Sequence, residues 1–148
     1  MDKNTRKAQV VVSLHDQDRQ TFSFLLLKTT ERRGEYWQNV TGKVEENETF
    51  EEAALREAME ETGLQVESIV DIRDLGISHQ FTDQYQRKVN EKSFLIILDR
   101  PWEIKLDPSE HCEYRWLPLP ELSPEVVKFE GNYEALQKSA QLLQHWGR

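Results

Sequence analysis

The sequence predicts an α/β fold in which helices pack against a β-sheet. Two observations carry this prediction. The run Phe24–Leu27 is apolar at every position, which is typical of a strand covered on both faces. The stretch 49–62 carries helix signals at both ends. Thr49 and Glu52 have the spacing of a capping box, and Gly63 stands where a left-handed cap residue belongs.

The first third of the chain predicts a hairpin and a short extended run. Residues 7–14 and 21–28 read as two strands joined by the polar turn 15–18. The loop 29–34 that follows is polar and basic, and its cations either approach a phosphate or are simply solvated. An extended run, 36–40, then leads to Gly42. The candidates for a phosphate contact are Lys28, Arg32 and Arg33. Trp37, in the extended run, either packs under the loop after Gly42 or stacks on a base.

The loop 42–49 and the helix after it are expected to lie against the sheet. Asn47 tolerates positive φ better than most residues, so it is expected to close the turn before the helix. An apolar side of the helix is expected to face the sheet, and two small residues would let the helix sit close. The residues of this side are Ala54, Leu55, Ala58 and Met59.

The remainder of the chain adds strands and a last helix. Residues 69–72 and 75–77 are rich in β-formers, and 93–98 reads as a buried strand. Between them, 79–88 reads as a loop or hairpin tip beside the site, where Phe81 or Tyr85 either stacks on a base or covers the core. A strand is expected at 112–117, with Glu110 at its start. A last helix begins at Gly131–Asn132 with the core-facing residues Leu136, Ala140, Leu142, Leu143 and Trp146.

Composition bounds the class of protein. The 148 residues are expected to form a single domain, 1–148, and the single Cys112 excludes an internal disulfide. The first residues lack the form of a signal peptide, and no apolar stretch approaches the roughly 20 residues that cross a bilayer, so we expect a cytoplasmic protein with no membrane partner. The net charge of −8 argues against nonspecific nucleic-acid binding. An acidic protein that acts on a polyphosphate needs cations between the two.

Three carboxylates share one turn near the end of the helix. At about 100° per residue, Glu57 and Glu61 lie about 40° apart, and Glu60 lies about 60° to the other side of Glu57. Like charges at this spacing destabilise a helix by roughly 0.2–0.5 kcal/mol, and acids in the last turn also oppose the helix dipole. A hard divalent cation such as Mg²⁺ reverses the sign of this effect. The alternative is an acidic face that simply meets water.

The stretch 42–64 resembles the Nudix box at every fixed position. The box reads Gly-x5-Glu-x7-Arg-Glu-U-x-Glu-Glu-x-Gly-U, where U is aliphatic. Here its fixed positions are Gly42, Glu48, Arg56, Glu57, Glu60, Glu61 and Gly63, with Ala58 and Leu64 at the U positions. The resemblance implies the fold of the Nudix hydrolase family, an α/β fold with a mixed β-sheet sandwiched between α-helices.

The resemblance also implies a chemistry. Family members hydrolyse a nucleoside diphosphate linked to a further group, through attack of water on phosphorus, with a divalent metal as cofactor. Carried onto this chain, it implies Mg²⁺, with Mn²⁺ as a substitute, held by Glu57, Glu61 and Glu60 and by the Gly42 carbonyl. Arg56 can reach Glu52 or Glu60 on the helix and is expected to orient carboxylates, with a phosphate contact as the alternative. Glu48 is expected to fasten the loop, and Lys43 is the candidate for a phosphate contact.

Two flanking segments resemble the branch of the family that cleaves dihydroneopterin triphosphate. They are 37–46 and 110–117, and in that branch a glutamate at the position of Glu110 completes the metal site. Glu110 is therefore a candidate metal ligand or general base, with a turn glutamate as the alternative. This chain departs from the branch at Asn47, where glycine is usual, and across 78–92, which shows no convincing match. Pterin specificity is thus an open point.

The predicted function is a pyrophosphohydrolase that cleaves a (deoxy)nucleoside triphosphate or dihydroneopterin triphosphate to the monophosphate and pyrophosphate. The alternatives are hydrolysis of a nucleotide sugar, a dinucleoside polyphosphate or an RNA 5′ end, a nucleotide-binding module without catalysis, and a plain acidic interaction helix. The oligomeric state is open. The predicted catalytic residues are Glu57, Glu60, Glu61, Glu110 and Arg56, the metal ligands are Glu57, Glu61, Glu60, Glu110 and Gly42, and the substrate-binding residues are Lys43, Trp37 and Phe81.

Overall fold

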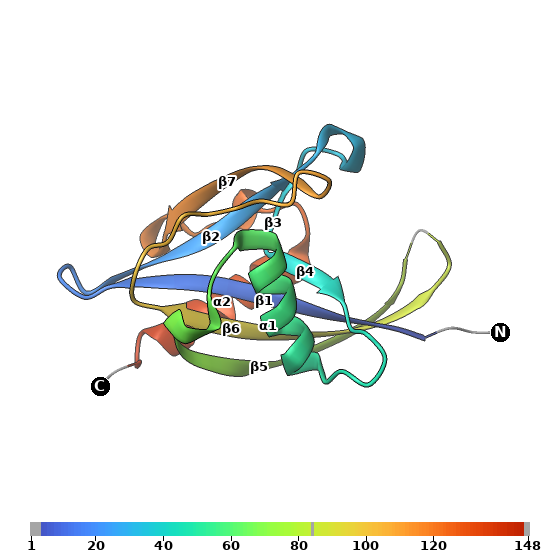
Figure 1. Ribbon diagram of the computed structural model, residues 1–148, viewed down its shortest axis with the longest axis horizontal. Coiled ribbons are helices and arrows are strands. Elements are labelled where there is room, and N and C mark those ends of the chain that lie inside the picture. Colours follow the sequence, from blue (N-terminus) through green and yellow to red (C-terminus); the bar gives the residue numbers. More distant parts are fainter. Residues whose placement is uncertain (1–3, 84, 147–148) are drawn as a thin grey trace.

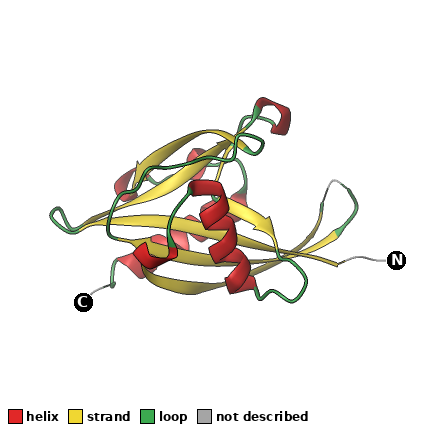
Figure 2. Cartoon of the chain, viewed as in Figure 1, coloured by secondary structure: helices red, strands yellow, loops and turns green. Residues whose placement is uncertain are grey.

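A computed structural model describes residues 4–83 and 85–146 of the chain. In these residues a seven-stranded mixed sheet lies between two α-helices (Figures 1 and 2). The strands run in the order β3-β2-β1-β6-β5, while β4 also pairs with β1 and β7 with β2. Their bounds are β1 Asn4–Asp16, β2 Thr21–Thr29, β3 Trp37–Gln38, β4 Val40–Lys43, β5 Ile69–Thr82, β6 Lys88–Leu98 and β7 His111–Pro118. The mixed sheet between helices agrees with the expected fold.

The centre of the sheet is the long strand β1. It forms the predicted antiparallel hairpin with β2 and runs parallel to β6 from Asn4 opposite Lys88 to Leu14 opposite Leu98. A parallel neighbour requires a long crossover connection, and here that connection contains the first helix. The parallel pair is what makes the sheet mixed.

Alternate residues of the central strands enter two separate cores. Val10 and Val12 of β1 pack on the side of helix α1 (Phe50–Thr62), whereas Val11 packs on the side of helix α2 (Glu130–Leu143). The predicted apolar run in β2 divides in the same way, and all four of its residues are at most 1% exposed. Because successive side chains of a strand point to opposite faces, both faces need a helical cover.

Helix α1 has the predicted ends. The Thr49 hydroxyl accepts the Glu52 N–H, the Glu52 carboxylate accepts the Thr49 N–H, and Gly63 has φ 76°. The alanines at its face are fully buried, as expected for Ala54 and Ala58. The prediction for Met59 is wrong, because this residue lies about 140° around the helix from Ala54 and is 41% exposed.

The prediction of a loop at 79–88 is partly wrong. Strand β5 continues through His79–Thr82, pairing with Lys88–Glu91 of β6, so only the tip of the hairpin turns, and Gln84 within it lies outside the described residues. The predicted segments 69–72 and 75–77 belong to this one strand. Its pairing with β6 is irregular near Gly76, which has φ 71°, and the register shifts between Asp74 and Ser78.

The last helix agrees with its prediction. α2 begins at Glu130, its residues Leu136 and Leu143 are buried, and Ala140 and Leu142 pack on the same core. Of the helices in the described residues, none has the length and apolar character that crossing a bilayer requires.

Candidate active site

The loop between β4 and α1 is tied together by one carboxylate. Glu48 Oε1 accepts the Glu45 N–H at 2.9 Å, and Glu48 also binds the Arg56 guanidinium. The hydrogen bond from Arg56, more than any other cause, lowers the pKa of Glu48 to about 2. Asn47 has φ 68°, as expected for the residue that closes this turn. Glu48 thus fastens the loop onto the helix, as the sequence led us to expect.

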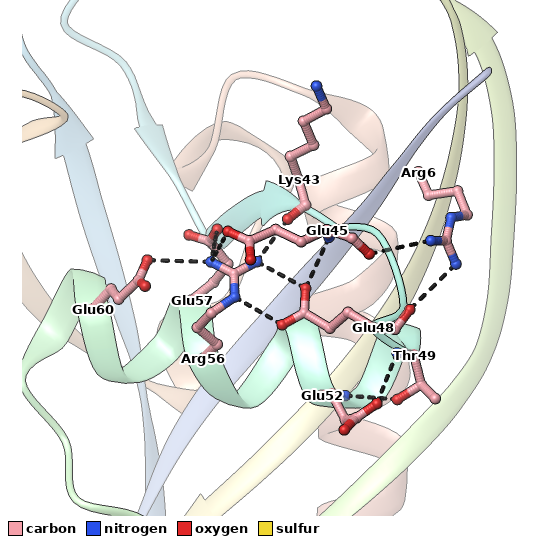
Figure 3. A network of polar contacts seen from close by, with 9 residues as sticks. All are labelled: Arg6, Lys43, Glu45, Glu48, Thr49, Glu52, Arg56, Glu57 and Glu60. Atoms are coloured by element: carbon pink, nitrogen blue, oxygen red, sulfur yellow. Dashed lines mark hydrogen bonds and ion pairs between the residues drawn. The ribbon is translucent and has the colours of Figure 1, made fainter. Parts of the chain in front are cut away.

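Arg56 is fully engaged by the protein (Figure 3). Its Nε donates to Glu48, its Nη1 to Glu57 at 2.8 Å and to Glu60 at 3.2 Å, and its Nη2 to Glu48 and to the Lys43 carbonyl. These contacts use all five N–H donors of a guanidinium. The expected link to Glu60 is present, whereas Glu52 is occupied by the helix cap. The hydrogen bond to Glu48 is the main reason why the pKa of Arg56 is raised above its usual value.

Glu57 lies directly against Gly42. A Cβ at position 42 would overlap the side chain of Glu57, including its carboxyl carbon, so only glycine leaves space for the carboxylate. Burial raises the pKa of Glu57, and the hydrogen bond from Arg56 opposes that rise. The close approach of Gly42 to Glu57 explains why this position of the box is a glycine.

Glu61 is a buried acid without a protein partner for one of its oxygens. The residue is 5% exposed, and its Oε2 has no hydrogen-bond partner. Burial, followed by the charges of Glu57 and Glu110, raises the pKa of Glu61 to about 9. We refer to Glu57, Glu61 and Glu110 as the carboxylate cluster, since each of the first two senses the charge of Glu110.

Sequence reasoning missed a buried histidine beside the cluster. His111 is 1% exposed, and its Nδ1 lies 3.7 Å from Glu61 Oε1. Its Nε2 lies 2.9 Å from Gln38 Nε2 of β3. Because an amide nitrogen only donates, this imidazole nitrogen accepts, which leaves the ring proton on Nδ1, facing Glu61. Burial lowers the pKa of His111 to about 4. The signal in the sequence was that His111 follows Glu110 in the segment 110–117, and that Gln38 belongs to the segment 37–46, both of which resemble one branch of the family.

Glu110 lies at the start of β7, where a second arginine holds it. Arg33 Nη1 is 2.6 Å from Glu110 Oε2 and donates to the Glu110 carbonyl at 3.2 Å. The sequence left two interpretations of Arg33 open, a contact with phosphate or a solvated position in the loop. The structure places its charge at the carboxylate cluster, where it opposes the rise in the pKa of Glu61 and adds to the effect of burial in lowering the pKa of His111.

Within the described residues, no hydrogen bond or ion pair joins the side chains of the predicted substrate-binding residues to the carboxylate cluster. Lys43 is exposed, and its ammonium points away from the Arg56 contacts (Figure 3). Trp37 packs on the α2 side of the sheet under Arg115, so the expectation that it lies under the loop 42–49 is wrong. Its neighbour Gln38 instead contacts His111. Phe81 is 43% exposed on β5.

The donor set suits a hard cation, although arginines now hold part of it. Within residues 4–83 and 85–146, no group of three or more His, Cys, Asp or Glu side chains is arranged to hold a metal ion as it stands. Glu57 is turned to Arg56 and Glu110 to Arg33. The unpaired oxygen of Glu61 and the crowding of like charges nevertheless fit a divalent cation, which prefers carboxylate oxygens.

Comparison with known proteins places this geometry in a family. The model of the NUDIX domain matches residues 4–138. A rat bis(5'-nucleosyl)-tetraphosphatase [asymmetrical] is 30% identical over 126 residues, which cover 85% of this chain and 84% of that protein. The dihydroneopterin triphosphate diphosphatase of Escherichia coli is 28% identical over 144 residues, which cover 90% and 91%.

Two further similarities differ in scope. An octanoyltransferase of Myxococcus xanthus is 30% identical over 118 residues, but the match spans only 31% of its length, against 78% of this chain. Among solved structures, an Ap4A hydrolase binary complex from C. elegans superposes with a TM-score of 0.81 at 22% identity, covering 96% of this chain and 99% of that one. This last likeness concerns the fold alone.

Proposed function

Since this chain belongs to the Nudix hydrolase family and acts on phosphoanhydride bonds of nucleotide derivatives, we propose that it is a Mg²⁺-dependent pyrophosphohydrolase. Its substrate in this proposal is a (deoxy)nucleoside triphosphate or dihydroneopterin triphosphate, and its products are the monophosphate and pyrophosphate. The proposal is supported by the similarity to the E. coli relative, which is named for dihydroneopterin triphosphate. That similarity covers about nine tenths of both chains. We also propose that residues 1–148 form a single domain, which the match over 4–138 supports.

The observation that carries the proposal is the convergence of like charges at Glu61. Its carboxylate is buried, has an unpaired oxygen and lies within the fields of Glu57 and Glu110. Without a metal ion such a site keeps a proton on the buried acid, as the raised pKa of Glu61 shows, and a bound cation would favour the ionised form instead. In the proposed enzyme Glu57, Glu61 and Glu110 would hold the metal ion, with Glu60 and the Gly42 carbonyl beside them.

The remaining roles follow from contacts of this chain. The bound metal would neutralise the polyphosphate and lower the pKa of a water. Arg56 fixes the direction of Glu57 and Glu60 through its two Nη1 contacts. Glu110 is the candidate to accept the proton of the attacking water, because it is only half-buried. Water adds to phosphorus, the bridging P–O bond breaks, and pyrophosphate leaves with the electron pair of that bond.

A second candidate function is cleavage of a dinucleoside tetraphosphate. The rat relative named for this activity covers 85% of the chain, and the box chemistry is the same. The two activities differ in products, since asymmetrical cleavage of a dinucleoside tetraphosphate gives a nucleoside triphosphate and a monophosphate without pyrophosphate. Products therefore discriminate the candidates.

The test is a product analysis over a substrate panel. The panel holds nucleoside triphosphates, dihydroneopterin triphosphate, diadenosine tetraphosphate, nucleotide sugars and triphosphorylated RNA, each with Mg²⁺ and with chelator. Glu61→Gln runs beside the unaltered protein, and Glu67→Gln, an exposed glutamate beyond the helix, is the matched control. We expect pyrophosphate to be released from a triphosphate. This release should be lost with chelator and in Glu61→Gln, but not in Glu67→Gln. Absence of Mg²⁺-dependent turnover on every substrate would refute the proposal.

A further inference from the structure

We propose that Arg33 is a substrate-binding residue that holds Glu110 in the free protein and transfers to a phosphate of the substrate when metal and substrate bind. The inference rests on the proposed function, because it assumes that Glu110 turns to a metal ion and that the substrate carries a phosphate chain. Four features of the structure support it, namely the fixed loop, the donors of Arg33, those of Arg56, and the charge at the site.

The backbone that carries Arg33 is fixed. The short helix η1, Glu31–Arg33, joins β2 to β3, and the Thr30 carbonyl accepts the N–H groups of Arg33, Gly34 and Glu35 at 2.9 to 3.1 Å. The Thr30 N–H donates to the Glu110 carbonyl, so the loop is attached to the start of β7. A fixed base leaves only the side chain of Arg33 to move, and that side chain is 32% exposed.

Arg33 has donors to spare. Only its Nη1 contacts Glu110, and within the described residues its Nε and Nη2 have no hydrogen-bond or ion-pair partner. A guanidinium carries five N–H donors in a planar fork that matches two oxygens of a phosphate. Arg33 can therefore donate from Nε and Nη2 to a phosphate oxygen while its Nη1 still contacts Glu110.

Arg56, the other arginine at the site, has no such freedom. All of its donors are used by Glu48, Glu57, Glu60 and the Lys43 carbonyl. Binding a phosphate through Arg56 would break contacts that hold the loop and the carboxylates. The geometry therefore divides the work between the two arginines, with Arg56 orienting carboxylates and Arg33 meeting the substrate.

The exchange keeps charges paired throughout. In the free protein the guanidinium of Arg33 neutralises Glu110, whose side chain is 43% exposed. If the Glu110 carboxylate held a metal ion, Arg33 would lose this partner, and the phosphate chain of the substrate would supply a new negative charge for it. A bidentate contact of the guanidinium with a phosphate would then replace the single contact between Arg33 Nη1 and Glu110 Oε2.

Two binding measurements with opposite expected signs test the inference. Mn²⁺ affinity is measured by the EPR signal of the free ion, and the affinity of the Mn²⁺-loaded protein for imidodiphosphate, a nonhydrolysable phosphate-chain probe, by calorimetry. For Arg33→Gln we expect Mn²⁺ to bind roughly threefold or more tighter, since a competing positive charge is gone. We expect the probe to bind roughly tenfold or more weaker, since a charge-assisted hydrogen bond is lost.

Matched variants separate this role from others. Arg32→Gln removes the same charge from the neighbouring exposed position, where the described residues include no ion-pair partner, so both affinities should stay within about twofold. Arg33→Lys keeps the charge but loses the fork, and we expect an intermediate loss of probe affinity.

Three outcomes would overturn the inference. One is a parallel fall of both affinities in Arg33→Gln, which would mean that Arg33 only positions Glu110. Another is no change in either affinity. The third is an absence of probe binding by the unaltered protein. Turnover by the unaltered protein on the substrate panel is a separate readout, so an active enzyme that is indifferent to Arg33 would leave the proposed function standing.

Discussion

At the scale of single residues, the missing side chain of Gly42 decides where a carboxylate lies. Gly42→Ala would place a methyl group on the Glu57 side chain, so the carboxylate must move away from β4. We expect kcat/KM to fall roughly 100-fold, because small misplacements of catalytic groups cost about that much. Stability should fall by about 1–3 kcal/mol from overpacking. Steady-state kinetics and urea denaturation measure the two effects.

Gly131 provides the matched control for this substitution. A Cβ there would come no nearer than 3.9 Å to His79, and the residue lies in the first turn of α2. Gly131→Ala should leave kcat/KM unchanged and raise stability by up to about 1 kcal/mol, because alanine favours a helix. If Gly42→Ala behaved in the same way as Gly131→Ala, the packing of Glu57 against Gly42 would not matter to the reaction.

The second residue-scale prediction concerns Gln38, which is 4% exposed. Its amide donates to His111, so Gln38→Met leaves a buried imidazole nitrogen without a partner. We expect a loss of about 1–3 kcal/mol in urea denaturation, the usual cost of an unsatisfied buried group. Gln80→Met, on the exposed side of β5, should change stability by less than about 0.5 kcal/mol. Equal losses in both variants would show that the contact with His111 is not what stabilises the fold.

At the scale of elements, α1 depends on its cap and on small residues. Thr49→Ala removes the hydroxyl that accepts the Glu52 N–H, and we expect unfolding to become easier by about 0.5–2 kcal/mol. Thr49→Ser keeps the hydroxyl and should restore most of the loss. Thermal denaturation of the three proteins measures this, and a serine variant as unstable as the alanine variant would mean that the methyl group of Thr49 matters instead.

Helix ends could be predicted from the sequence because caps are local. Thr49, Glu52 and Gly63 signal the limits of α1 within a few residues of where they act. Which side of α1 contacts the sheet is not decided locally. Met59 was predicted on the wrong side, because apolar character alone does not say which residues meet the sheet. The continuation of β5 through Thr82 was likewise missed, since pairing with β6 decides it.

At the scale of the whole molecule, the site joins residues from separate segments, and Gly42 of β4 is one of them. Glu57 and Glu61 come from α1, Gln38 from β3, Arg33 from η1, and Glu110 with His111 from the start of β7. The proximity of Glu57 to Glu61 could be predicted because both lie on one helix. The meeting of Arg33, Gln38 and His111 with these carboxylates could not be predicted, because only the pairing of β2 with β3 and β7 brings them together.

The last prediction follows from Glu61 and concerns the stability of the whole fold. The pKa of Glu61 is about 9 in the metal-free protein, against about 4.5 when unfolded. Between these values the folded state binds more protons than the unfolded state, so the free energy of unfolding must fall as pH rises, by up to about 1.4 kcal/mol per pH unit. Burial of His111 acts only below its unfolded pKa of about 6.5, where the folded protein, with a pKa of about 4, loses stability as pH falls.

The range from pH 6.5 to 9 therefore excludes the titration of His111. Burial also raises the pKa of Glu57 and of Glu91, so the variant Glu61→Gln is needed to assign the change to Glu61. Urea denaturation in chelator should show stability declining across this range, and Glu61→Gln should flatten the decline because it removes the titrating group. Saturating Mg²⁺ should flatten it as well, since a cation favours the ionised carboxylate that the fold otherwise disfavours. A decline that persisted unchanged in Glu61→Gln would place the titrating group elsewhere. A decline that Mg²⁺ left untouched would contradict the assignment of the metal ion to Glu61.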